Sequence, residues 1–190
     1  EEMAANLHYA TRYIRANAEK FGVNKERIGM MGASAGGHLT LLTSMTATDG
    51  DPEAKDPVEK ESAKIQAVTV FFPPTDFLTW GEKPADLERL GDILFADGVK
   101  GKTPEEIEAK AKSISPALLP VPSDMPPSLL IHGDADDVVP LQQSEVMIDA
   151  LAKANVTHRL IVEAGGGHAW LTIREDVETM AEWLNTHLKQ

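Results

Sequence analysis

Apolar residues in this chain fall into short continuous runs that alternate with longer stretches of helical spacing. Four mostly apolar runs predict buried strands, at residues 27–31, 65–72, 128–132 and 158–163. Helical spacing predicts helices at residues 2–20, 35–46, 141–154 and 172–189, and shorter ones around 84–95 and 104–112. A charged segment at 49–61, with Pro and Gly, predicts a loop. This alternation is typical of an α/β fold with a parallel sheet flanked by helices.

The first predicted strand leads into Gly32-Ala33-Ser34-Ala35-Gly36, a G-x-S-x-G pattern ahead of a predicted helix. Between a strand and a helix, this pattern is typical of the nucleophile elbow of serine hydrolases. The sharp turn projects the serine Oγ from the sheet edge, and small neighbours let the strand and helix backbones approach. The same pattern also fits a glycine-rich turn that binds a phosphate on its amides. The other residues that a hydrolase needs must decide between the two interpretations.

Three carboxylates follow the third predicted strand: Asp134, Asp136 and Asp137. Sites in open α/β sheets form outside the carboxyl ends of the strands, so each of the three is a candidate for the acid of a hydrolase. Each is also compatible with a solvated loop residue or with the N-cap of the helix that follows. The spacing alone leaves this choice open.

The general base can be found by elimination among the six histidines. A hydrolase with this elbow has its residues in the order Ser, acid, His, which leaves His158, His168 and His187. His158 opens a strand and His187 lies in the terminal helix, whereas His168 follows the last strand through a glycine turn. We therefore predict that His168 is the base. His38 and His132 are predicted to have structural roles.

Five segments in order resemble the α/β-hydrolase fold, and within it the feruloyl-esterase-like and hormone-sensitive-lipase-like carboxylesterases. They span almost the whole chain and lie at residues 32–39, 72–77, 113–116, 126–140 and 165–168. In the G-D-x-D-x-x-V-P pattern of this family the second aspartate is the catalytic one. The resemblance therefore implies Asp136 as the acid.

The resemblance implies a serine esterase that cleaves carboxylic esters, of the short-chain, acetyl or feruloyl type, through an acyl-enzyme. Ser34 is the expected nucleophile, with His168 as base and Asp136 as its orienting acid. The backbone N–H of Ala35 is expected to donate to the oxyanion. The expected partner is a small-molecule ester.

The resemblance also implies one catalytic domain over residues 1–190, with a cap or pocket insertion at 73–127. Phe77 and Trp80 in this insertion, and Trp170 close to the expected base, are candidate substrate-binding residues. Each of the three is equally compatible with a buried core position.

The chain departs from the family pattern ahead of Ser34, where an H-G-G-type oxyanion loop is absent. We therefore expect these residues to form the second half of the fold, with the first strands supplied by further residues or by a separate chain. The strand before Ser34 would then have an unpaired edge. Since loss of one oxyanion donor costs about 10²–10³ in kcat, the 190 residues alone are expected to be weakly active or inactive.

Composition narrows the class of function. The formal net charge of −12 disfavours nucleic acid and anionic membrane surfaces as partners. The absence of cysteine excludes disulfides and thiol catalysis, and no apolar run is long enough to span a membrane. No cluster of His or Cys suggests a metal, so we expect neither a metal nor a cofactor.

Two other functions are compatible with the same residues. A peptidase of the prolyl-oligopeptidase type shares this catalytic half-domain and a similar aspartate segment. A non-catalytic binding or scaffold protein could also use a hydrolase fold, because a fold by itself does not establish an activity.

Overall fold

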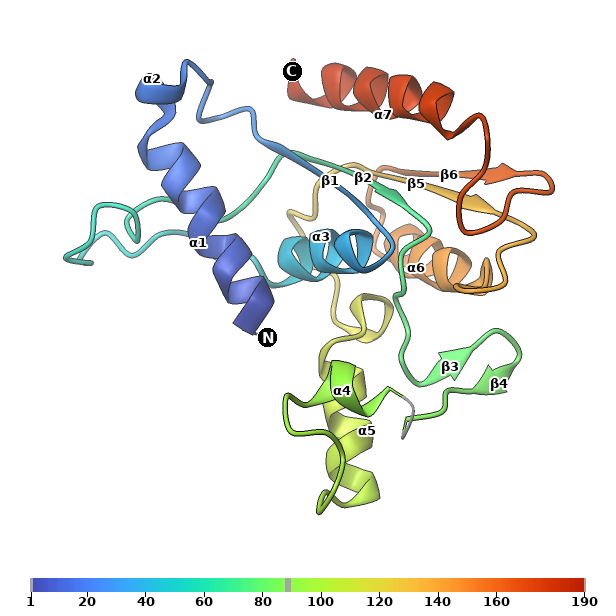
Figure 1. The fold of residues 1–190 in the computed structure, drawn as a ribbon. Helices are drawn as coiled ribbons and strands as arrows, with labels where there is room; N and C mark the ends of the chain where they lie inside the picture. Colours follow the sequence, from blue (N-terminus) through green and yellow to red (C-terminus); the bar gives the residue numbers. More distant parts are fainter. Residues whose placement is uncertain (1, 88–89, 190) are drawn as a thin grey trace.

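A computed structural model describes residues 2–87 and 90–189 of the chain. Its main sheet has four parallel strands in the order β1-β2-β5-β6 (Figure 1). The strands are β1 (Gly29–Ala33), β2 (Ala67–Phe71), β5 (Ser128–Gly133) and β6 (His158–Glu163). The predicted parallel sheet of an α/β fold is therefore confirmed.

Helices cover both faces of this sheet (Figure 1). Helix α7 (Ile173–Leu188) lies on one face, and α3 (Ala35–Thr46) and α6 (Gln142–Lys153) lie on the other. Helix α1 (Glu2–Ala16) packs beside α3, and the short α2 (Ala18–Phe21) follows it. Because each strand is followed by a helix that returns the chain, all carboxyl ends of the strands meet at one edge.

The apolar runs of β2 and β5 are continuous because these two strands are covered on both faces. All their residues are buried, whereas β1 and β6 at the two edges are only partly buried. Met31 on β1 is 50% exposed, and no described strand pairs with the outer edge of β1.

Apolar side chains pack in three clusters. One lies between the sheet and helices α3 and α6, and includes Leu41, Met45, Val68, Val70, Leu130, Met147 and Leu151. A second lies on the α7 side, and includes Phe71, Phe72, Leu129, Ile131 and Met180. The third joins α1 and α3 to the segment after β2, and comprises Ala4, Leu42, Phe77, Leu94, Ala111 and Ile114.

Residues 73–127 leave the sheet after β2 and return to it at β5. They contain β3 (Thr79–Trp80), β4 (Lys83–Pro84), α4 (Gly91–Leu94), α5 (Pro104–Ser113) and the 3-10 helix η1 (Pro116–Leu118). The part from β3 to α5 lies beyond α3 and α6, away from the sheet (Figure 1). Thr103 begins α5 with a capping box to Glu106, which explains why this short helix is stable where the sequence predicts it.

Several element boundaries differ from the sequence prediction. The helix expected over 2–20 breaks at Asn17, whose side chain donates to the carbonyl of Tyr13. The first strand begins at Gly29 rather than at residue 27, because the N–H of Ile28 is bonded to the Gln66 side chain. Gly22 ends the short helix α2 in the left-handed conformation, with φ of 65°.

The helix expected around 84–95 is wrong over most of its length. Lys83 and Pro84 form β4 in a two-residue antiparallel pairing with β3, and only Gly91–Leu94 are helical. Residues 88–89 of that prediction lie outside the described residues. Hydrophobic periodicity does not predict β3 and β4, since a two-residue strand is too short to show a period.

Candidate active site

Ser34 occupies a strained turn between β1 and α3. Its φ of 52° and ψ of −120° are rare for a residue with a side chain. The Ser34 N–H donates to the carbonyl of Phe71 at 3.0 Å, and the Ser34 carbonyl accepts from the His38 N–H at 3.0 Å. These two bonds fix the turn between the end of β2 and the first turn of α3.

The two glycines of the G-x-S-x-G pattern are not equivalent. A Cβ on Gly32 would lie 2.3 Å from the carbonyl oxygen of Gly36, so this position accepts only glycine. A Cβ on Gly36 would meet no described atom within 4 Å. The close approach of strand and helix expected from the pattern therefore depends on Gly32.

The loops after β5 and β6 are joined backbone to backbone. The Ala135 N–H donates to the Gly166 carbonyl at 2.9 Å, and the Asp134 N–H donates to the Glu163 carbonyl at 3.1 Å. The Asp134 carboxylate in turn accepts from the Gly165 N–H at 2.6 Å. Asp134 is thus occupied in holding the glycine turn, which is a role that the sequence did not indicate.

Three side chains meet at the carboxyl ends of the strands. The Asp136 Oδ2 lies 2.8 Å from the His168 Nδ1, and the His168 Nε2 lies 2.9 Å from the Ser34 Oγ. Because a carboxylate can only accept, the His168 Nδ1 carries the proton and its Nε2 accepts from the serine hydroxyl. Asp137, the third carboxylate of the segment, is exposed.

The Asp136 carboxylate is buried, with a side-chain exposure of 0%, whereas the His168 side chain is 27% exposed. Burial by itself raises the pKa of the Asp136 carboxyl. The hydrogen bonds from Val139 N–H, His168 and Val138 N–H outweigh burial and hold this pKa below its usual value. Asp136 is therefore an anion that faces the imidazole of His168.

Four of the other histidines contact groups other than Ser34. The His38 Nε2 donates to the Ile114 carbonyl at 2.7 Å, and burial lowers the pKa of its imidazole. His132 is fully buried beside Ser144 and Val139. His158 bonds to the Val156 carbonyl, and His187 packs on Trp183.

Aromatic rings support His168 from one side. The ring of Phe72 lies 4.4 Å, centroid to centroid, from the imidazole, and the Phe72 backbone has φ of 34°. The Trp170 ring contacts Phe71 and Phe72 edge-on, and its Nε1 donates to the Asp176 carboxylate at 2.7 Å. The sequence places Phe72 at the end of a predicted strand and at the start of the segment 72–77 that resembles the family; a positive φ beside the imidazole is not visible in a sequence pattern.

The other predicted site residues have different degrees of exposure. Ala35 is exposed and is the first residue of α3, so its N–H has no partner within the helix. Phe77 is 3% exposed and packs against His38 and Trp80, with ring centroids 5.1 Å and 6.3 Å away. The Trp80 side chain is partly exposed.

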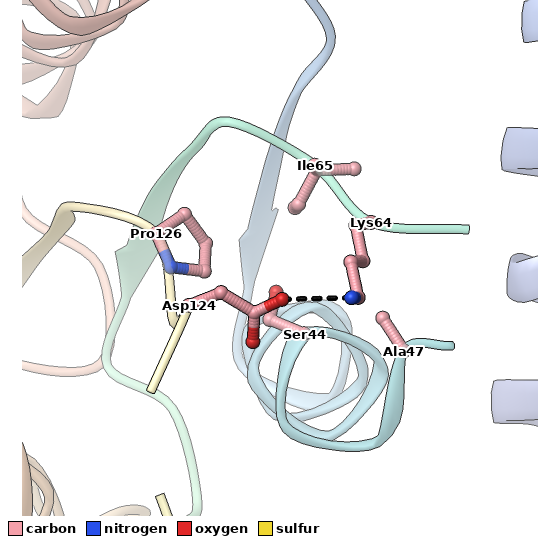
Figure 2. A pocket seen from close by; sticks show the side chains of 6 residues that line it. All are labelled: Ser44, Ala47, Lys64, Ile65, Asp124 and Pro126. Atoms are coloured by element: carbon pink, nitrogen blue, oxygen red, sulfur yellow. Dashed lines mark ion pairs between the residues drawn. The ribbon is translucent and has the colours of Figure 1, made fainter. Parts of the chain in front are cut away.

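Two hollows lie at the opposite edge of the sheet, at the amino ends of β2 and β5. The smaller is lined by Ser44, Ala47, Lys64, Ile65, Asp124 and Pro126 and has a volume of about 10 Å³, room for about one water molecule (Figure 2). Lys64 and Asp124 in its lining form an ion pair of 2.8 Å (Figure 2). The larger, of about 460 Å³, is open and is also lined by Lys64 and Asp124. Neither hollow includes Ser34, Asp136 or His168 in its lining.

Within residues 2–87 and 90–189, no three His, Cys, Asp or Glu side chains are grouped so that they could hold a metal ion. No helix in the described part of the chain has the length and apolar character needed to cross a membrane.

A protein family and several known proteins are similar to this chain. The BD-FAE family profile matches residues 3–151. Esterase LipC of Mycobacterium tuberculosis is 29% identical over 161 residues, which cover 83% of this chain and 39% of LipC. The probable carboxylic ester hydrolase LipM of the same organism is 26% identical over 77% of this chain and 32% of its own length. The chain thus spans about two fifths or less of these relatives.

A solved esterase structure is also similar to this chain. A truncated form of a carbohydrate esterase from gut microbiota is 27% identical, with a TM-score of 0.82, over 98% of this chain and 68% of that one. Its likeness to this chain extends over the whole sheet and both helical layers. Since the family profile also covers more than half of the chain, the chain belongs to the BD-FAE family, a group with the α/β-hydrolase fold.

Proposed function

We propose that the protein is a serine esterase that hydrolyses carboxylic esters of short-chain, acetyl or feruloyl type. The observation that carries the proposal is the continuous chain of hydrogen bonds from Asp136 through His168 to Ser34, with distances of 2.8 Å and 2.9 Å. A buried anion, an imidazole of defined tautomer and a hydroxyl on a strained turn are the parts of a Ser-His-Asp triad.

In the proposed first half-reaction, the Ser34 Oγ attacks the ester carbonyl carbon while the His168 Nε2 takes the hydroxyl proton. The Asp136 carboxylate stabilises the imidazolium that forms and keeps Nδ1 protonated. The tetrahedral intermediate then expels the alcohol, which takes the proton from Nε2. This leaves an acyl group on Ser34.

In the second half-reaction, water attacks the acyl carbon while His168 takes one of its protons. Collapse of this intermediate returns the proton to the Ser34 Oγ and releases the carboxylic acid. The Ala35 N–H and the amino end of α3 would stabilise the negative oxygen in both steps.

Substrate contacts belong to the same proposal. Residues 73–127 would act as a pocket insertion, and its attachment to α3 through the His38–Ile114 bond supports a fixed position relative to Ser34. The partly exposed Trp80 and Trp170 are the candidate contacts. Phe77 would support Trp80 from behind, since it is itself buried.

A fluorophosphonate probe tests the proposal on the complete natural polypeptide that contains these residues. We expect one labelled serine, and loss of the label in S34A. The matched control is S44A, which removes a buried hydroxyl from α3, the helix that follows Ser34, and keeps the label. Hydrolysis of 4-nitrophenyl acetate and methyl ferulate, compared with a prolyl peptide amide, separates esterase from peptidase. An unlabelled wild type would refute the proposal.

A further inference from the structure

Asp136 has a second histidine behind it. His132, near the end of β5, places its Nε2 at 3.4 Å from the same Asp136 Oδ2 that accepts from His168. The side chains of His132 and Asp136 both have an exposure of 0%. A fully buried imidazole at this position is costly unless its polar atoms are paired, so its partners indicate what it does.

Both ring nitrogens of His132 have buried partners. Nε2 lies 2.8 Å from the Val139 carbonyl oxygen, and Nδ1 lies 2.7 Å from the Ser144 Oγ. A carbonyl only accepts, so Nε2 carries the proton; Nδ1 then accepts from the Ser144 hydroxyl. Ser144 is on α6 and is also fully buried. The two partners fix one neutral tautomer.

This tautomer directs a single N–H toward the acid loop. The Nε2–H holds the carbonyl of Val139, and the N–H of Val139 donates to the other oxygen of Asp136 at 2.9 Å. The same Nε2–H lies close to Oδ2. Both oxygens of the carboxylate are thus positioned by a unit that His132 anchors to β5 and α6.

We propose that His132 and Ser144 are positioning residues for Asp136, and set the orientation and the charge that its carboxylate presents to His168. This inference rests on the proposed function. Among the described residues, the titratable groups that face His132 are Asp136 and His168; the Ser144 hydroxyl, the Val139 carbonyl and the Phe72 ring also contact it. Burial lowers the pKa of His132, in agreement with a neutral ring.

The test compares H132M, H132Q and S144A in the complete natural polypeptide. A methionine fills the space without a donor, whereas a glutamine amide can replace the Nε2–H. The matched control is S128A, which removes a fully buried hydroxyl at the other end of β5. Rates of 4-nitrophenyl acetate hydrolysis are measured from pH 5 to 9 and divided by the active sites that a fluorophosphonate probe titrates. Unfolded molecules then do not affect the rate per active site, because the probe does not label them.

In H132M we expect kcat per active site to fall about tenfold, since a hydrogen bond next to a charged group is lost. The acid limb of kcat/KM should move to higher pH, because a carboxylate with fewer donors stabilises protonated His168 more strongly. H132Q should restore most of the kcat and of the pH limb of the wild type. S144A should give values between those of H132M and the wild type, and S128A should match the wild type.

Two results overturn the inference while leaving the esterase proposal intact. One is a labelled, active wild type whose pH limb and kcat are unchanged in H132M and S144A, even if both variants melt at lower temperature. The other is an H132Q variant that is no better than H132M. A wild type that the probe does not label refutes the esterase proposal and this inference together.

Discussion

A Cβ on Gly133 would lie 2.1 Å from the carbonyl oxygen of Gly166, so these two glycines bring the loops after β5 and β6 into direct backbone contact. The contact is followed at once by Asp136 on one loop and by His168 on the other. The distance of 2.8 Å between their side chains therefore depends on two residues that carry no functional group.

We predict that G133A separates these loops. The new methyl group meets backbone rather than a movable side chain, and such overpacking costs about 1–3 kcal/mol of unfolding free energy. Esterase activity should fall further than stability, because the loops carry Asp136 and His168. Gly167 provides the control, since a Cβ there would meet only the Ala169 carbonyl at an ordinary 3.7 Å. Urea unfolding and kcat are measured for both; equal effects of G133A and G167A would refute the prediction.

A second prediction concerns the acid. The Asp136 Oδ1 accepts from the N–H groups of Val138 and Val139, so the amide oxygen of a D136N variant should stay there. Its NH₂ then faces the His168 Nδ1, which forces the proton of the imidazole onto Nε2. That tautomer cannot accept from Ser34, and the expected loss in kcat is about 10⁴.

The control for this experiment is D137N, which changes the exposed neighbouring carboxylate by the same single atom. It should keep the activity of the wild type. Steady-state rates with 4-nitrophenyl acetate separate the two variants, and circular dichroism checks that both are folded. If D137N were the impaired variant, Asp136 would not be the acid.

Particular residues show how far the sequence alone could lead. Ser34 and His168 were predictable, because a strand–turn–helix pattern and the chain order restrict them strongly. The choice among Asp134, Asp136 and Asp137 was not predictable from spacing, because it depends on the contact of Gly133 with Gly166, which are distant in sequence. Only the family resemblance selected Asp136, and the structure places that carboxylate against His168.

How far the strands and the contact of His132 could be predicted from the sequence also has physical causes. The strands β2 and β5 were predictable because burial on both faces gives continuous apolar runs. The exposure of Met31 and the pairing of the outer edge of β1 depend on what lies beside that strand. The sequence of β1 alone does not encode this. Chain order predicts a structural role for His132, because this residue precedes the acid. Its contact with Asp136 arises only when the following loop folds back.

The third prediction separates two roles for Trp170. If it positions the loop of His168 through its bond to Asp176, W170F should lower kcat severalfold and leave KM nearly unchanged. D176A removes the same bond from the other side, so the double variant should be no worse than either single one. D176N retains an acceptor and is the control. A rise in KM that grows with acyl chain length, with kcat unchanged, would instead indicate direct substrate contact.

The fourth prediction concerns acid stability. Burial lowers the pKa of His38 in the folded protein, whereas an unfolded histidine titrates at about pH 6.5. Below that pH the unfolded chain binds a proton that the folded chain does not, so the unfolding free energy decreases as the pH falls. The slope from this group is at most about 1.4 kcal/mol per pH unit and vanishes well above pH 7.

The variant H38Q isolates this contribution, because a glutamine can still donate to the Ile114 carbonyl but does not titrate. Urea unfolding at several pH values from 5 to 8 should give a flatter dependence in H38Q than in the wild type. Two parallel curves would show that His38 is protonated equally in the folded and unfolded states.

The last prediction concerns the attachment of the 73–127 segment. Gln143 is fully buried at the start of α6. Its side-chain amide bonds to backbone groups of this segment, as a neighbouring strand would. Its Oε1 accepts from the N–H groups of Thr75 and Asp76 at 2.7 Å and 2.8 Å. Its Nε2 donates to the carbonyls of Asp76 and Thr79 at 3.1 Å and 2.7 Å.

The variant Q143M keeps the shape of the side chain but leaves these four backbone groups unpaired. Each buried group without a partner costs about 1–3 kcal/mol, so we expect a loss of several kcal/mol and early proteolysis within 73–127. Q142M is the milder comparison, because Gln142 is only partly buried and its Oε1 accepts from one backbone N–H, that of Gly81, and from the Gln143 amide. Limited proteolysis with mass spectrometry locates the first cuts. First cuts at the same sites in both variants, or in Q143M outside 73–127, would show that Gln143 does not hold the segment in place.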